Sequence, residues 1–243
     1  MDGIGLFGGT FNPIHMGHLK VARDVKAGFQ LEKVYLIPCA LPPHKGTAAL
    51  ADAKDRLRMI EVAIEKEDDF AVSDVEIRRQ GVSYSIDTVL WFQHQIPPDQ
   101  PCFLIMGMDA FLEIDTWKSF QTFFDVIPMI VMTRPMETRD PAETGKPGET
   151  TEKEKHTQNP RLPSKEAESL ETYIHLHVDP QYSFEPASFC FVHPRRRSVY
   201  LYHVTPMPVS ATQIRERVRR KAKITGLVPA SVEKYILEKG LYV

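Results

Sequence analysis

Apolar residues recur along this chain in short runs that alternate with stretches of helical period. Most of the runs are rich in Val, Ile, Leu and Met with little polar alternation, which is typical of strands buried inside a parallel sheet. The predicted strands cover residues 4–7, 33–38, 70–77, 102–106, 126–132 and 198–204.

Helices are predicted between these strands. Asp52 is a suitable N-cap for one of them, and residues 86–93 form another. The apolar residues expected to face inward are Leu19, Ala22, Val25 and Phe29, then Leu57, Ile60 and Ile64, then Val89 and Leu90, and finally Ala211, Ile214 and Val218. The alternation predicts an α/β fold, a Rossmann-like open parallel sheet with helices on both faces, within a single domain over residues 1–243.

The pattern fails at residues 135–172, which are rich in Pro, Glu and Lys and contain no Phe, Trp or Tyr. Such a segment cannot bury enough apolar surface to offset its conformational entropy. We expect a mobile surface insertion, and favour a solvated linker over a partner-binding element. His175 and His177 follow it; we expect them on a strand surface rather than at a metal site, because no cysteine or third histidine is near.

Composition limits the classes of function. The chain has 243 residues, 42% of them hydrophobic, and a formal net charge of −2, which gives no basic footprint for nucleic acid. No apolar run is long enough to span a bilayer, so we expect a cytoplasmic protein that binds no membrane. Cys39, Cys102 and Cys190 are odd in number and far apart, which favours reduced, mostly buried thiols.

The stretch GGTFNPIHMGHL, residues 8–19, joins the first predicted strand to the first helix. Strand-to-helix junctions at the carboxyl edge of an α/β sheet bind nucleotides, because free N–H groups and the helix N-terminus attract phosphate. His15 and His18 are three residues apart, so both rings can lie over a helix turn that begins near Gly17. The spacing alone is more typical of incidental surface polar residues; the family resemblance described below makes a phosphate site the better interpretation.

A second such junction is predicted near the C-terminus. Ser210 and Gln213 form a capping-box pattern that starts a helix. Arg215 lies in its first turns, where a guanidinium can bind a triphosphate through two parallel hydrogen bonds. The other basic residues of this helix are expected to form a solvated face.

Several further motifs occur in a fixed order with the first loop. They are Pro42-Pro43-His44-Lys45, Ser83-Tyr84-Ser85-Ile86-Asp87-Thr88, Met106-Gly107-Met108-Asp109 with Trp117, Thr133-Arg134-Pro135, Val209-Ser210-Ala211-Thr212-Gln213-Ile214-Arg215, and a C-terminal stretch from Leu227 to Tyr242. Apart from residues 135–172, the chain resembles the bacterial nicotinate mononucleotide adenylyltransferases of the His-x-Gly-His nucleotidyltransferase superfamily over nearly its whole length.

The resemblance implies roles for individual residues. The catalytic set is His15, His18 and Arg215. The ATP-binding set is Gly8, Gly9, Thr10, Phe11, Gly17, Gly107, Asp109, Ser210 and Thr212, and the mononucleotide-binding set is Lys45, Ser85, Trp117 and Arg134. Two positions depart from the family pattern, since Ser85 stands where Thr is expected and Asn12 where Asp is common.

The implied reaction is adenylyl transfer from ATP to nicotinate mononucleotide, giving nicotinate adenine dinucleotide and pyrophosphate, a step of NAD biosynthesis. Mg²⁺ would bind through the substrate phosphates, without a dedicated metal site on the protein. We expect a monomer or small homo-oligomer. Two alternatives remain open, namely a phosphopantetheine adenylyltransferase of the same superfamily and a nucleotide-binding regulator that does not turn over.

Overall fold

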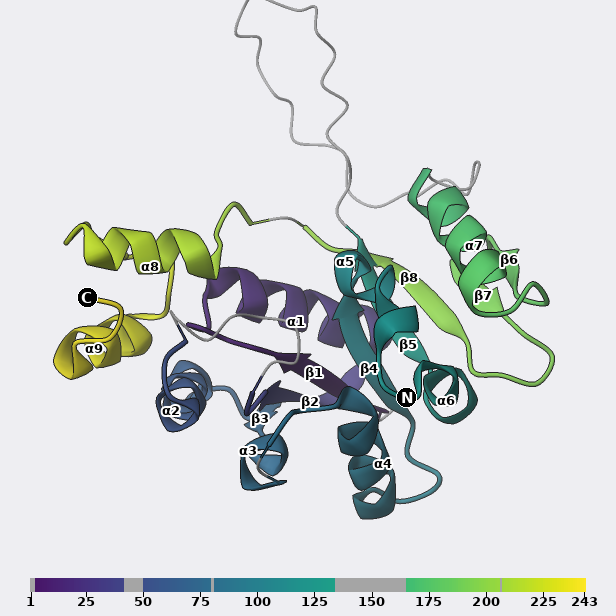
Figure 1. Ribbon diagram of the computed structural model, residues 1–243, viewed down its shortest axis with the longest axis horizontal. Helices are drawn as coiled ribbons and strands as arrows, with labels where there is room; N and C mark the ends of the chain where they lie inside the picture. The colour runs from purple at the N-terminus through teal and green to yellow at the C-terminus, as the bar shows by residue number, and fades with distance from the viewer. Residues whose placement is uncertain (1–2, 42–49, 80, 134–164, 206) are drawn as a thin grey trace, which may run out of the picture.

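The computed structural model describes residues 3–41, 50–79, 81–133, 165–205 and 207–243. Its centre is an eight-stranded sheet with the order β3-β2-β1-β4-β5-β8-β7-β6 (Figure 1). The strands are β1 (Gly3–Gly9), β2 (Leu31–Pro38), β3 (Phe70–Val72), β4 (Cys102–Gly107), β5 (Met129–Thr133), β6 (Ser183–Glu185), β7 (Cys190–Val192) and β8 (Val199–His203).

Six neighbouring strands, from β3 to β8 in the sheet order, pair in parallel, which confirms the predicted sheet. The sheet is nevertheless mixed, because β7 pairs antiparallel with β8 and β6 antiparallel with β7. This edge hairpin was missed at the sequence level, since its strands have only three residues each and little apolar run to signal them.

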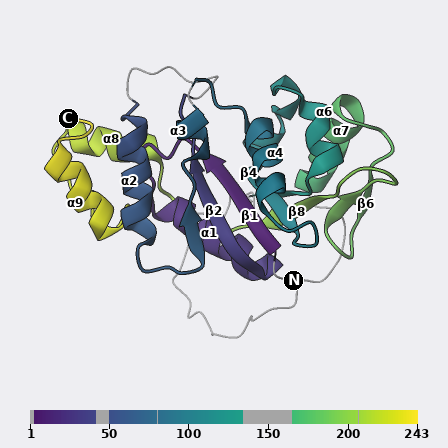
Figure 2. The ribbon, with the colours of Figure 1, turned by 90° about the horizontal axis from the view of Figure 1, so that it is seen from below.

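Helices cover both faces of the sheet. They are α1 (Met16–Phe29), α2 (Ala53–Ile64), α3 (Val75–Arg79), α4 (Ser85–Gln95), α5 (Met108–Phe111), α6 (Phe120–Val126), α7 (Lys165–His177), α8 (Ala211–Arg219) and α9 (Ala230–Lys239), with a 3₁₀ turn, η1 (Ile114–Thr116). Figure 2 shows α2 beside α9 on one side of the strands and α4, α6 and α7 on the other.

Two hydrophobic clusters fill the space between the sheet and these helices. Alternate residues of β4 divide between them, with Leu104 and Met106 in one cluster and Phe103 and Ile105 in the other. The first cluster includes residues of α4, α6 and α7, and the second includes residues of α1, α2, α8 and α9. The helices expected on both faces are therefore confirmed.

Two predicted element bounds were wrong. The extended stretch over residues 70–77 ends at Val72, and α3 takes up the rest. The strand over residues 126–132 starts only at Met129, because Val126 ends α6. Apolar residues that end a helix and begin a buried strand give one continuous apolar run, so hydrophobicity alone does not locate the boundary.

Some residues expected to face inward do not. Leu90 is 37% exposed, whereas Ile86, Val89 and Phe92, three residues apart, form the buried stripe of α4. In α2 Leu57 is only half-buried, and Arg56 is fully buried in its place.

The predicted insertion ends before residue 172. Residues 135–164 lie outside the described residues, but residues 165–172 begin α7, whose Ala167, Leu170 and Ile174 are buried. His175 and His177 therefore lie on a helix, and the strand predicted for them was wrong. Glu and Lys occupy the outer face of α7, and the segment before it is also polar. The amphipathic spacing of this helix was therefore not recognised in the sequence.

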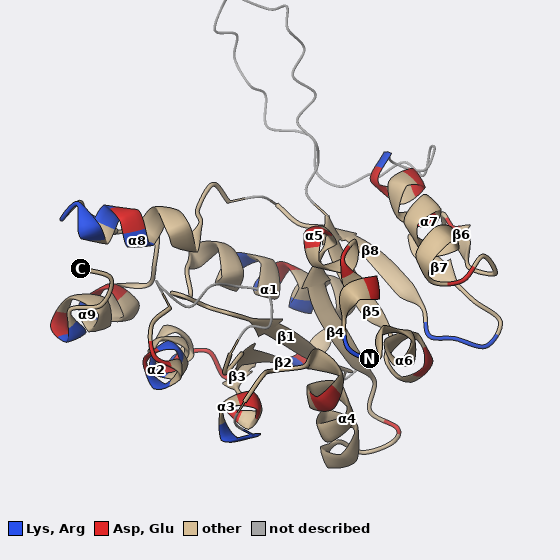
Figure 3. Ribbon diagram, in the orientation of Figure 1, with Lys and Arg blue, Asp and Glu red and all other residues tan. Residues whose placement is uncertain are grey.

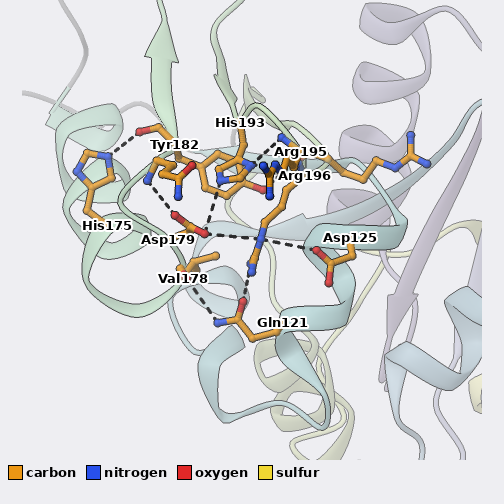
Figure 4. Close-up of polar contacts among 11 residues, drawn as sticks. Gln121, Asp125, His175, Val178, Asp179, Tyr182, His193, Arg195 and Arg196 are labelled. Carbon is orange, nitrogen blue, oxygen red and sulfur yellow. Dashed lines mark hydrogen bonds and ion pairs between the residues drawn. The ribbon is translucent and has the colours of Figure 1, made fainter.

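A polar cluster holds the edge hairpin against α6 and α7 (Figure 4). Arg196 donates from Nη1 to Oε1 of Gln121 over 2.5 Å, and its Nε lies 3.6 Å from Asp125 and 3.7 Å from Asp179. Nδ1 of His193 accepts hydrogen bonds from the backbone N–H groups of Arg195 and Arg196. These contacts stabilise the added edge of the sheet, away from the carboxyl ends of β1 and β4.

Two further predictions concern the surface and the thiols. The basic residues beyond Arg215, from Arg217 to Lys223, are exposed around the end of α8, which confirms a solvated charged face (Figure 3). The three cysteines are free, with Cys190 buried and Cys39 and Cys102 half-buried.

Among the helices described, none is long and apolar enough to cross a membrane.

Candidate active site

A cavity of about 720 Å³ opens at the carboxyl ends of β1 and β4, which are neighbours in the sheet. Ligands of open α/β sheets bind at this edge, where strand ends leave room between the loops. Of the predicted site residues, the cavity wall brings together Gly8, Gly9, Thr10, Ser85, Gly107, Asp109 and Trp117.

Glycines keep the cavity open at the two strand ends. A Cβ built on Gly8 or on Gly107 would meet no atom within 4 Å. The space in front of both residues is therefore available to a ligand that approaches the backbone closely.

His15 and His18 cap the first helix reciprocally. Nδ1 of His15 accepts from the backbone N–H of His18 over 3.4 Å, and Nδ1 of His18 accepts from that of His15 over 3.3 Å. The two rings stack, with centroids 3.6 Å apart and planes 22° from parallel. Since Nδ1 is an acceptor in each ring, the neutral form carries its proton on Nε2, which is then a donor.

Neighbouring residues fix the histidine rings. Phe11 is 2% exposed, and its ring packs edge-on against His18 with centroids 5.0 Å apart. A Cβ on Gly17 would lie 3.1 Å from Nδ1 of His15, so glycine allows the close packing of that ring. Phe11 and Gly17 thus support the histidines, and neither lines the cavity.

The second helix junction lies beside this loop. Oγ of Ser210 accepts from the backbone N–H of Gln213, which confirms Ser210 as the N-cap of α8. Arg215 donates from Nη1 to the carbonyl oxygen of Asn12 over 2.8 Å and from Nη2 to Oγ1 of Thr212 over 3.1 Å. Helix α8 thereby brings a guanidinium and two hydroxyl side chains next to the histidine loop, outside the cavity wall itself.

Asn12 joins this loop to two distant segments. Its Oδ1 accepts from the backbone N–H of Ala51 over 3.0 Å and from the hydroxyl of Tyr242 over 2.8 Å. Burial raises the pKa of Tyr242 well above its usual value, so the phenol stays a donor. An amide at position 12 therefore accepts two hydrogen bonds that hold the loop, and the contact with Tyr242 was not predicted from the sequence.

The cavity wall also includes an aromatic side chain and the N-terminus of a helix. Trp117 follows η1 and packs edge-on against Phe123 with centroids 5.8 Å apart, and Ser85 starts α4. Lys118, which the sequence did not single out, lies beside them, with Nζ 4.7 Å from the ring centre of Tyr84 and 3.0 Å from Asp87. Lys45 and Arg134 lie outside the described residues.

A buried carboxylate was also missed. Glu76 is 6% exposed, lines the cavity, and accepts the hydroxyl of Thr88 over 2.7 Å, while Arg79 donates to that hydroxyl over 3.0 Å. A single Glu on a short helix carries no sequence signal that would have identified it. Within the described ranges no group of three or more His, Cys, Asp and Glu side chains is placed to hold a metal ion.

Comparison with known proteins agrees with this geometry. The cytidylyltransferase-like family model matches residues 6–217. The chain is 39% identical over 241 residues to the "Probable nicotinate-nucleotide adenylyltransferase" of Desulfatibacillum aliphaticivorans, covering 98% of this chain and 99% of that protein. It is 34% identical over 239 residues to the protein of the same name from Geotalea uraniireducens, covering 98% and 97% of the two chains.

A solved structure shares the fold. The Plasmodium falciparum nicotinic acid mononucleotide adenylyltransferase complexed with NaAD aligns with a TM-score of 0.65 over all of this chain and 98% of that one, at 15% identity. The full-length match to curated relatives and the family model over most of the chain lead to one conclusion: this chain belongs to the nicotinate-nucleotide adenylyltransferase family of cytidylyltransferase-like proteins.

Proposed function

We propose that this protein transfers the adenylyl group of ATP to nicotinate mononucleotide, giving nicotinate adenine dinucleotide and pyrophosphate. The observation that carries the proposal is the stacked pair His15 and His18 at the N-terminus of α1, next to the cavity that Gly8, Gly9 and Thr10 line. Family membership supports the same reaction.

The reaction is a displacement at phosphorus. A phosphate oxygen of the mononucleotide attacks the α-phosphorus of ATP, a new P–O bond forms, and the bond between that phosphorus and the β-phosphate oxygen breaks to release pyrophosphate. No protein nucleophile is needed. The protein contributes by holding two anions in line and stabilising the charge on the five-coordinate phosphorus.

His15, His18 and Arg215 suit that second task. The Nε2 donors of the two rings and the guanidinium of Arg215 would bind the triphosphate at the N-termini of α1 and α8, where the helix ends favour negative charge. Because packing and capping already fix the histidine rings, little reorganisation is needed when the phosphate binds.

We assign binding of the mononucleotide to the part of the cavity wall that Trp117 and Ser85 form. Trp117 would stack on the pyridine ring, and the hydroxyl of Ser85 with the first amides of α4 would bind the nicotinate carboxylate. Lys45 and Arg134 are proposed to neutralise the mononucleotide phosphate. Ser85 lacks the methyl group of threonine, so its hydroxyl is held less firmly in one rotamer.

Mg²⁺ is proposed to bind with the triphosphate. It needs only one or two carboxylates besides phosphate oxygens, and the exposed Asp109 on the cavity wall offers such an oxygen. When bound, the ion neutralises phosphate charge. The protein residues retain the roles given above.

An isotope experiment tests the chemistry. Nicotinate mononucleotide with ¹⁸O in its phosphate is incubated with MgATP and the protein, and both products are analysed by mass spectrometry. We expect the dinucleotide to retain all the label and the pyrophosphate to carry none. Label in pyrophosphate, or AMP released without dinucleotide, would contradict attack by the mononucleotide oxygen.

A further inference from the structure

Arg56 is an arginine in the interior of the protein. It lies in α2 and is 0% exposed, although arginine is almost never fully buried without a charged partner. Its side chain points toward the loops that follow β1 and β2, and no sequence motif marks this position.

The guanidinium of Arg56 binds three backbone carbonyls from three parts of the chain. Nη1 donates to the oxygen of Thr10 over 2.9 Å, Nη2 to that of Ala40 over 2.9 Å, and Nε to that of Ala51 over 3.0 Å. Thr10 belongs to the histidine loop, Ala40 follows β2, and Ala51 precedes α2. One side chain therefore fixes the relative positions of these segments.

Within the described part of the chain, Arg56 makes no ion pair with a carboxylate. Arg56 also contacts the thiol of Cys39, whose Sγ lies 3.9 Å from Nη1. Burial raises the pKa of Cys39, so the thiol does not supply a negative charge. Glu76 lines the same cavity as Cys39, but its hydrogen bond joins it to Thr88. Carbonyl dipoles offset the buried charge only in part.

Arg56 lies directly behind the wall where we place the phosphates. Thr10 and Cys39, both in contact with it, line the cavity together with Gly8 and Gly9. Charges in a dry interior act over longer distances than charges in water. A polyanion bound in front of this wall would thus be attracted by the guanidinium behind it.

We propose that Arg56 is a positioning residue for the nucleotide: it holds the loops after β1 and β2 in their binding geometry and supplies, from behind the cavity wall, positive charge that the phosphates of ATP balance. This inference rests on the proposed function for the identity of the anion. It assigns Arg56 no direct contact with the substrate.

Binding of MgATP, measured by calorimetry on the full chain, tests the proposal. Arg56→Gln should weaken binding about 10- to 100-fold, the effect of removing charge-assisted hydrogen bonds, and Arg56→Lys should weaken it less because the charge remains. Arg58→Gln is the matched control, since Arg58 lies on the same helix but is exposed and pairs with Glu61. That variant should bind MgATP within about twofold of the parent.

A chemical rescue experiment distinguishes a positioning role of Arg56 from a general contribution to the stability of the fold. Arg56→Ala removes the atoms of an ethylguanidine from a buried site, and adding ethylguanidine should restore MgATP affinity in a saturable way. Arg56→Gln and Arg56→Lys variants that lose thermal stability equally, yet bind MgATP as the parent does, would overturn the proposal. A folded Arg56→Ala protein whose MgATP affinity does not respond to ethylguanidine would overturn it as well.

Binding of MgATP is measured without an acceptor mononucleotide, so the result does not depend on which acceptor the protein uses. If the parent protein binds MgATP but forms no dinucleotide, the proposed function fails while the Arg56 variants still test this inference. If the dinucleotide forms and the Arg56 variants bind MgATP normally, the inference fails while the proposed function stands.

Discussion

Arg215 donates a hydrogen bond from Nη1 to the backbone carbonyl of Asn12 across 203 positions of sequence, at 2.8 Å. The bond joins α8 to the loop between β1 and α1, which carries both histidines. Asn12 in turn accepts hydrogen bonds from Ala51 and Tyr242. The histidine loop is therefore fixed by contacts to the segment before α2 and to the C-terminal part of the chain.

Arg215→Lys tests how much the positioning of the histidine loop depends on the guanidinium of Arg215. Lysine keeps the charge but cannot bind Asn12, Thr212 and a phosphate together. We expect kcat/KM for ATP to fall by about 10- to 100-fold. Arg219→Lys, on the exposed end of the same helix, should leave kcat/KM unchanged. Equal values for Arg215→Lys and the parent would show that only charge matters at this position.

His18→Ala removes one proposed phosphate donor and one of the two reciprocal caps of α1. Loss of a transition-state donor should lower kcat by about 10²- to 10⁴-fold, while circular dichroism shows a folded protein. His94→Ala is the control, because His94 is exposed at the end of α4. A kcat near that of the parent would remove His18 from the mechanism.

Two glycine substitutions should separate binding from folding. Gly107→Val places its side chain in the open space of the cavity, so we expect near-normal thermal stability with loss of nucleotide binding. Gly28→Ala would instead drive a Cβ into the ring of Tyr202, whose hydroxyl donates to the carbonyl of Asp24 over 2.9 Å. That variant should lose stability. Normal MgATP binding by a folded Gly107→Val protein would contradict our placement of the ligand.

Alkaline pH should unfold the protein as its tyrosines ionise. Six of the eight tyrosines have a raised pKa, chiefly through burial, and for Tyr173 and Tyr235 it reaches about 12. Below the unfolded pKa of about 10, their neutral forms contribute full stability. As the pH rises from 10 to 12 the unfolded chain releases these protons first, so stability falls.

The measurement is a tyrosinate absorbance titration run in parallel with far-ultraviolet circular dichroism. We expect most of the absorbance change to accompany loss of helix signal, and the urea-unfolded chain to titrate near pH 10. Complete ionisation near pH 10 in a protein that keeps its helix signal would contradict the burial of these phenols.

The parallel sheet could be predicted because its strands are continuous apolar runs. The helices that cover it could be predicted where a capping residue marks their start. Asp52 and Ser210 cap α2 and α8 as their positions in the sequence suggested. The edge hairpin and α7 could not be predicted in the same way. Three-residue strands carry too few apolar positions, and the helical spacing of Ala167, Leu170 and Ile174 follows a long polar segment.

The parts of the candidate site that lie within a local sequence motif could be predicted. His15 and His18 meet because residues three apart share a helix face, and Gly107 ends a strand, β4, that is evident from the sequence. Arg56, Glu76 and Tyr242 were not predicted, since their importance comes from contacts with segments far away in the chain. A buried arginine on an amphipathic helix is indistinguishable, in sequence, from one on the exposed face.

The most direct test of the proposed function is pyrophosphate release from MgATP with one acceptor at a time: nicotinate mononucleotide, nicotinamide mononucleotide or phosphopantetheine. We predict release with nicotinate mononucleotide, much slower release with the amide, and none with phosphopantetheine. Release with phosphopantetheine alone would assign the site to another acceptor. Absence of release with all three, in a folded protein that binds MgATP, would contradict the proposed reaction and favour a nucleotide-binding regulator.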